Sequence, residues 1–341
     1  MKSYDQKINK FFYYWLLLSF FMVFIMIIVG GLTRLTDSGL SITEWELFKG
    51  IFPPLNDFTW NQYFSLYKQI PQYRLINSNM SLDQFKVIFY WEYFHRMLGR
   101  VIGLSFLVSF IYFYFKKQID RKYLSICFLI LILIILQGIL GWYMVQSGLT
   151  NDVTVSHYRL SLHLSLAFII ISIIFWNLLN FRRNNIKNFF IIKKENFIFY
   201  FLIFLIFLQI ALGAFVSGLD AGKIYQTWPL MDNNYFPSDT LIFSIKDIFN
   251  FENQGLTQFY HRNLAYLILF YSLAVGFFVF KEGKTKLIKS FYLLSLLLTL
   301  QVFLGIMTLI TGLNIVLASA HQICSVLLML SSINLYYNYI N

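Results

Sequence analysis

Two short stretches of similar sequence carry side chains suited to acid–base chemistry and metal ligation. The first, WEYFHR, covers residues 91–96, and the second, QFYHR, covers residues 258–262. Glu92 and His95 are three residues apart, so on a helix they share one face. The second stretch keeps the His-Arg pair but has an amide, Gln258, in place of the carboxylate. Both stretches border apolar runs, where ionisable groups are costly and mark functional sites.

The histidines extend this pattern to a set of four. Comparing the two halves of the chain aligns His95 with His261 and His163 with His321. Each half then offers two imidazoles at one depth on two helices, within about two turns of the outward helix ends, as axial ligation of a haem requires. Zinc would need cysteines or several carboxylates nearby, so porphyrin iron is favoured. A hydrogen-bonding role between helices is the alternative.

Three further residues near these histidines are weaker candidates. Arg96 and Arg262 follow their histidines directly and could pair with haem propionates, as arginine does with carboxylates. Snorkelling of both arginines to the membrane interface is equally compatible with the sequence. His157 precedes His163 by six residues, on another helix face and nearer water. We interpret His157 as an interfacial histidine without a ligand role.

Glu92 is the residue that separates a catalyst from an electron carrier. Because Gln258 occupies the corresponding position, the carboxylate is not needed to build the fold. An enzyme could use it to accept a proton, or to stabilise positive charge at a carbon next to the porphyrin. A hydrogen bond from Glu92 to the outer loop is the structural alternative.

The elements that must position these residues are membrane-spanning helices. Hydrophobic residues make up 58% of the 341 residues and charged residues 13%, with a mean hydropathy of +0.63. Soluble domains carry about a quarter charged residues. Eight runs are long enough to cross a hydrocarbon core of about 30 Å. They lie near 12–31, 89–115, 123–145, 158–180, 197–217, 259–280, 288–311 and 315–338. The sequence therefore predicts an all-α polytopic membrane protein.

The net charge of +11 is explained by membrane topology, without a nucleic-acid partner. Lysines and arginines gather in alternate short loops, near 116–122, 182–194 and 281–289. The positive-inside rule then makes both termini cytoplasmic and turns the two long loops outward. The short N-terminus has no Arg-rich transit stretch, which favours a bacterial plasma membrane over the mitochondrial inner membrane. Cys127 and Cys324 both lie in apolar segments, so we expect no disulfide.

An internal repeat divides the chain into two halves. LQGILG at 136–141 recurs as LQIALG at 208–213 and LQVFLG at 300–305, and residues 30–39 parallel residues 213–222. We predict two pseudo-symmetric four-helix bundles, related by an axis along the membrane normal. They comprise residues 1–187 with outer loop 32–88, and residues 188–341 with outer loop 218–258. Trp45, Trp60 and other aromatic or proline residues favour folded caps over solvated loops.

Several motifs together resemble the haem A synthase family, in order and over nearly the whole chain. They are GGLTRLTDSGLSITEW at 30–45, KGIFPPL at 49–55, Tyr67–Tyr73, EYFHRMLGR at 92–100, YRLSLHL at 158–164, TWPLM at 227–231, FYHRNLAY at 259–266 and SAHQ at 319–322. The pattern is similar to that of the alphaproteobacterial and mitochondrial branch. The paired loop cysteines of the other branch do not occur here, so no loop disulfide is carried over.

The resemblance implies an oxidoreductase that converts haem O to haem A for cytochrome c oxidase. The C8 methyl group would be oxidised to a formyl group through a hydroxymethyl intermediate. The resemblance places the substrate haem in the N-terminal half, at His95 and His163, and a haem b cofactor in the C-terminal half, at His261 and His321. It makes Glu92 the essential carboxylate and leaves His157 outside the ligand set.

The expected partners follow from the same resemblance. They are haem O as substrate, the membrane farnesyltransferase that makes haem O (haem O synthase), cytochrome c oxidase assembly factors and the lipid bilayer. A homo-oligomer is left open. Two alternatives belong to other classes: a bis-histidine b-type cytochrome that passes electrons from quinol, and a haem transporter or chaperone. Neither alternative would change the haem chemically.

Overall fold

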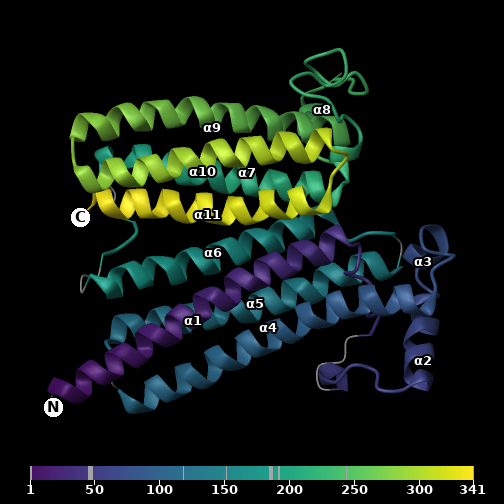
Figure 1. Cartoon of the computed structure of the whole chain (residues 1–341), viewed down its shortest axis with the longest axis horizontal. Coiled ribbons are helices and arrows are strands. Elements are labelled where there is room, and N and C mark those ends of the chain that lie inside the picture. The colour runs from purple at the N-terminus through teal and green to yellow at the C-terminus, as the bar shows by residue number, and fades with distance from the viewer. Residues whose placement is uncertain are drawn as a thin grey trace. The chain divides into compact units, whose positions relative to one another are not determined.

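The structure is all-helical apart from one isolated bridge between Met231 and Asn234 in the part of the chain it describes. It is a computed structural model that describes residues 2–44, 49–117, 119–150, 152–183, 187–190, 193–242 and 244–340. Trp45, expected in the first outer cap, lies outside these residues. Within them, 8 helices are long and apolar enough to cross a membrane (Figure 1). The prediction of an all-α polytopic membrane protein is confirmed.

The long helices correspond one to one to the predicted runs. They are α1 (Lys2–Leu35), α4 (Leu82–Lys116), α5 (Arg121–Thr150), α6 (His157–Arg182), α7 (Phe197–Gly218), α9 (Gln254–Glu282), α10 (Thr285–Ile310) and α11 (Ile315–Tyr339). Shorter helices lie in the connections: η1 (Lys49–Ile51), α2 (Asp57–Tyr67), α3 (Pro71–Leu75), η2 (Lys194–Asn196), η3 (Ala221–Lys223) and α8 (Ile245–Ile248).

Helix α4 begins seven residues before its predicted start at 89. A capping box fixes this start, because Ser81 Oγ accepts from the Gln84 N–H while Gln84 Oε1 accepts from the Ser81 N–H. His95 therefore lies 13 residues after Leu82, about three and a half turns into the helix. The prediction that His95 lies within two turns of the helix end is wrong, because hydropathy does not detect polar first turns.

The chain forms two compact units, Met1–Ile174 and Phe175–Asn341, whose boundary falls within α6. In the first unit α4 packs against both α1 and α5. In the second unit α7 packs against α9 and α11, and α10 packs against the same two helices (Figure 1). The division into halves at residue 187, and the pseudo-symmetry between them, stay predictions.

The first outer loop folds around an aromatic cluster shared with the start of α4. Its buried members include Trp60, Phe64 and Tyr67 from α2, and Phe85 and Phe89 from α4. The Phe85 ring centroid lies 5.0 Å from that of Phe64 and 5.2 Å from that of Tyr67. Leu40 and Ile42 pack into the same cluster. The described part of this loop is a folded cap, as predicted.

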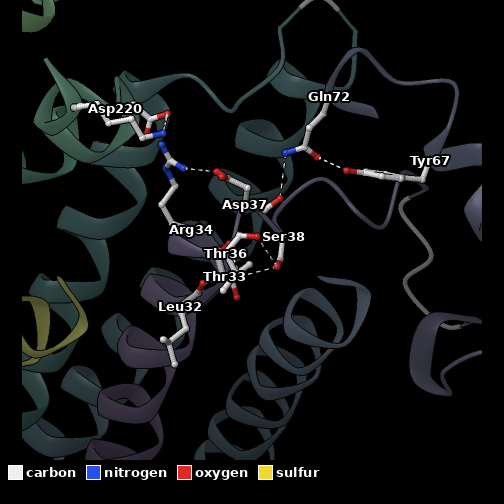
Figure 2. Close-up of polar contacts among 10 residues, drawn as sticks. Leu32, Thr33, Arg34, Thr36, Asp37, Ser38, Tyr67, Gln72 and Asp220 are labelled. Carbon is white, nitrogen blue, oxygen red and sulfur yellow. Dashed lines mark hydrogen bonds and ion pairs between the residues drawn. The ribbon is translucent and has the colours of Figure 1, made fainter. Parts of the chain in front are cut away.

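A tight turn after α1 directs the chain back toward α4. Asp37 adopts the left-handed conformation (φ 51°), and its carboxylate pairs with Arg34 at 2.8 Å. Figure 2 shows how the cap holds this turn: Tyr67 Oη donates to Gln72 Oε1 at 3.0 Å, and Gln72 Nε2 donates to the Asp37 carbonyl at 3.1 Å. Burial raises the pKa of the Tyr67 phenol, which keeps this donor protonated. The turn thereby places residues 40–42 next to the aromatic cluster.

The second outer loop is also folded in its described part. Tyr225 and Met231 are buried, and Tyr225 Oη donates to Asp239 Oδ1 at 2.6 Å. Asn253 caps α9 by accepting from the Leu256 N–H. Folded backbone therefore lies next to the start of α9, which carries His261.

Replacing Phe85 by alanine should loosen the first cap. Phe85 is 0% exposed, and truncating such an aromatic costs about 3–5 kcal/mol. We expect faster cleavage between α2 and α3 in limited proteolysis of the purified protein. Phe58→Ala is the matched control, because Phe58 lies on α2 but is 79% exposed. Equal cleavage of the two variants would contradict a packed cap.

Candidate functional site

Each of the four paired histidines lies against a glycine of a neighbouring helix. A Cβ atom added at these glycines would come within 3.1 Å or less of the imidazole Cε1. The contacts are Gly30 with His95 (2.9 Å), Gly141 with His163 (3.1 Å), Gly213 with His261 (3.1 Å) and Gly305 with His321 (2.9 Å). Any larger side chain would displace the ring, so the glycines set where each imidazole lies. The sequence repeat aligns these same glycines, 30 with 213 and 141 with 305.

The structure brings the histidines together in the predicted pairs. His95 on α4 and His163 on α6 are close enough to interact electrostatically within the first unit. His261 on α9 and His321 on α11 do so within the second. Among the described residues, no group of three or more His, Cys, Asp or Glu side chains could hold a metal ion. A pair of imidazoles without further protein ligands would suit a metal that brings most of its own ligands, as haem iron does.

The ring nitrogens of the second pair have polar partners. His321 Nδ1 lies 3.1 Å from the Gln301 carbonyl, which makes it the protonated nitrogen and leaves the Nε2 lone pair for a metal. In this structure that lone pair accepts from Gln301 Nε2 at 3.3 Å, a contact that a metal on Nε2 would replace. On α7, Gln209 Nε2 donates to the His261 carbonyl at 2.9 Å and lies 3.2 Å from His261 Nδ1.

The ring nitrogens of the first pair are less engaged. The Nδ1 atoms of His95 and His163 are buried and have no hydrogen-bond partner in the described part of the chain. Gln137 Nε2 donates to the His163 carbonyl at 3.0 Å, while His163 Nδ1 has no partner in the described part of the chain. The position in α1 that corresponds to these glutamines is Met26. The sequence shows that a glutamine recurs four residues before three of these glycines. It does not show that these glutamines contact the histidines.

Glu92 lies one turn before His95 and is 3% exposed. Its Oε2 accepts from Ser41 Oγ at 2.7 Å and from the Ile42 N–H at 2.8 Å. Its Oε1 accepts from Arg96 Nε at 3.1 Å and from Arg96 Nη2 at 2.5 Å. A buried carboxylate is tolerated only when it is paired and hydrogen-bonded, and these donors meet both conditions. The sequence did not point to Ser41 or Ile42 as its partners.

The second unit repeats this arrangement without the charge. Gln258 Nε2 donates to the Tyr225 carbonyl at 2.9 Å. Arg262 donates to the carbonyls of Tyr225 at 3.0 Å and Thr227 at 2.9 Å. In the first unit, Arg96 likewise donates to the carbonyls of Ile42 at 2.9 Å and Glu44 at 3.4 Å. Each arginine thus holds the backbone of its outer loop.

These contacts bear on three of the sequence predictions. The outer loop does donate hydrogen bonds to Glu92, as the structural alternative to a catalytic role predicted. These bonds are compatible with a chemical role as well. Pairing of Arg96 and Arg262 with propionates stays a prediction. His157, the first residue of α6, is buried with its ring centroid 4.1 Å from that of Tyr158. Its exclusion from the ligand set stays a prediction too.

The comparisons with known proteins cover both halves of the chain. A family model described as cytochrome oxidase assembly protein matches residues 13–333. The protein named "Heme A synthase" from Pelagibacter ubique is 49% identical over 314 residues, 91% of this chain and 90% of the relative. Proteins of the same name from Parvibaculum lavamentivorans and Nitrosospira multiformis are each 43% identical, over 88% and 90% of this chain and 86% and 87% of their own lengths.

A side chain at Gly141 should disturb His163 and the group it helps to bind. The Cβ of Gly141→Ala would lie 3.1 Å from the imidazole, whereas Gly138, three residues earlier on α5, has no atom within 4 Å of its added Cβ. We expect Gly141→Ala to lower haem binding by the purified protein at least several-fold, measured by absorbance titration. Gly138→Ala should bind as the unmodified protein does. Equal binding by both variants would show that the glycine contact does not position the ring.

Proposed function

The chain belongs to the cytochrome oxidase assembly protein family, and on that premise we propose that it is a haem A synthase. It would oxidise the C8 methyl group of haem O to a formyl group through a hydroxymethyl intermediate. One observation carries the proposal: two similar imidazole sites occur in one chain, and only the first has a buried acid, Glu92, where the second has Gln258. The assignment as an enzyme acting on haem agrees with the names of its relatives.

In this proposal the two histidine pairs have different occupants. His95 and His163 bind the substrate haem O, and His261 and His321 bind a haem b cofactor. Partners on the second pair support this division. The Gln301 carbonyl accepts from His321 Nδ1, the kind of bond that fixes a ligand imidazole for a permanently held group. In the first pair, the Nδ1 atoms have no hydrogen-bond partner among the described residues, which suits a ligand that must enter and leave. When bound, haem b supplies one-electron transfer.

Glu92 would act on the substrate next to its ligand His95. Oxidation of a methyl carbon to an alcohol and then to a formyl group develops positive charge and releases protons. A carboxylate one helical turn from the ligand can hold such a proton or stabilise that charge. The folded cap on Ser41, Ile42 and the aromatic cluster limits the access of water, which strengthens the effect of a fixed charge.

The cellular setting follows the same proposal. The N-terminal half, residues 1–187, would be catalytic, and residues 188–341 would hold haem b, with both termini in the cytoplasm. The protein is a multi-pass membrane protein, and we place it in the bacterial inner membrane. Haem O synthase would deliver the substrate, and cytochrome c oxidase assembly factors would receive the product. A homo-oligomer is compatible with this scheme.

Removing the acid should abolish the oxidation. We expect Glu92→Ala to lower haem A formation at least about 100-fold, the range lost with a general acid–base group, and haem O to accumulate. Extracted haems separated by chromatography give the measurement. Asp83→Ala is the control, because Asp83 is an exposed acid on the same helix. Unchanged haem A in Glu92→Ala, with two unaltered b-type haems, would favour an electron-transfer cytochrome instead.

Removing a ligand of the second pair should deplete the cofactor. We expect His261→Ala and His321→Ala to lose retained haem b, measured as haem per purified protein, because one imidazole cannot complete axial ligation. His157→Ala should keep its haem, since that ring is assigned no ligand role. Full haem b retention by both ligand variants would refute the placement of the cofactor in the C-terminal half.

A further inference from the structure

We propose that Ser41 is a positioning residue for Glu92, whose hydroxyl lets the buried carboxylate take up and release a proton without losing its hydrogen bonds. The inference rests on the proposed catalytic role of Glu92 and extends it to a residue on the outer loop. Ser41 is 1% exposed, and its backbone N–H donates to the Ser38 carbonyl at 3.2 Å. Its place is therefore fixed by the turn that follows α1.

The Ser41 hydroxyl has two acceptors within reach. Its Oγ lies 2.7 Å from Glu92 Oε2 and 3.3 Å from the carbonyl oxygen of Ile88, one helical turn earlier on α4. When Glu92 is ionised, Ser41 donates to Oε2. When Oε2 carries a proton, that O–H donates to Ser41 Oγ, and the Ser41 hydroxyl turns to donate to Ile88. The proton arrives at and leaves from Oε2, and no bond between heavy atoms changes.

The other recorded partners of Glu92 cannot follow this change. The Ile42 N–H and the Arg96 guanidinium only donate hydrogen bonds. A protonated Oε2 that faced donors alone would be a buried O–H group without an acceptor, and such groups are strongly unfavourable. A hydroxyl both donates and accepts, so Ser41 can satisfy both forms of the acid. Without it, Glu92 would be held tightly in one state and would exchange protons poorly.

The second unit provides an internal comparison. The repeat aligns Ser41 with Ile224 and Ile42 with Tyr225. The contacts agree with this register, because Arg96 donates to the Ile42 carbonyl and Arg262 donates to the Tyr225 carbonyl. Gln258, in place of the acid, has no proton to gain or lose. At the position of Ser41 stands Ile224, which is 44% exposed and has no hydroxyl. The hydroxyl and the acid thus occur together in one half.

The test compares four variants of the full chain, one of them Glu92→Ala, in membranes titrated with haem O. Ser41→Ala removes the hydroxyl and Ser41→Thr keeps it. Ser38→Ala is the matched control, because Ser38 is a buried serine of the same loop whose Oγ contacts Thr36 Oγ1 at 2.7 Å. We expect Ser41→Ala to lower kcat for haem O oxidation about 10- to 100-fold, below the full loss of an acid–base group. Its KM and retained haem b should not change.

The remaining outcomes are decisive. Ser41→Thr should recover kcat to within about threefold, because a hydroxyl remains beside Glu92, and Ser38→Ala should match the unmodified protein. A normal kcat in Ser41→Ala with an inactive Glu92→Ala would overturn the role of Ser41 and leave the proposed function standing. Normal rates in both would overturn the proposed function itself. Loss of retained haem b in Ser41→Ala, without recovery in Ser41→Thr, would show that Ser41 only supports the fold.

Discussion

The buried carboxylate of Glu92 ties helix α4 of the first unit to the outer loop. A charge in an apolar helix must be surrounded by donors, and the helix itself provides only Arg96. The other donors, Ser41 and the Ile42 N–H, come from a loop about 50 residues earlier in the chain. Satisfying the charge therefore fixes the loop against α4. The aromatic cluster around Phe85 then packs over the same segment, so the acid and the cap support each other.

The second unit shows what the same architecture does without the charge. Arg262 and Gln258 donate to carbonyl groups of the outer loop, much as Arg96 does. The second loop is therefore held without a carboxylate. The fold thus tolerates an amide at this position. An acid that costs desolvation, at a position where the second unit has an amide, is expected to be kept for chemistry. This contrast between equivalent positions supports a catalytic N-terminal half.

Close helix contacts, rather than loops, place the imidazoles. Each of the four rings meets a glycine on the adjacent helix, so the spacing of two helix backbones sets the position of the ring. Rigid helices hold ligands more accurately than loops do. Gln209 and Gln301 add polar contacts to the second pair. The two units therefore share one way of placing histidines and differ in the groups around them.

The sequence by itself determined the number of spanning helices, the pairing of the histidines and the contrast between Glu92 and Gln258. Hydropathy averaged over about 20 residues suffices for the first, and a repeat written in the chain suffices for the others. Only the tertiary structure decided that Ser41 reaches Glu92, that Arg96 and Arg262 bind loop carbonyls, and that glutamines contact His261 and His321. These contacts join residues far apart in the chain, and they depend on the left-handed turn at Asp37 and on close helix packing. The early start of α4 was missed because local capping, not hydropathy, sets it.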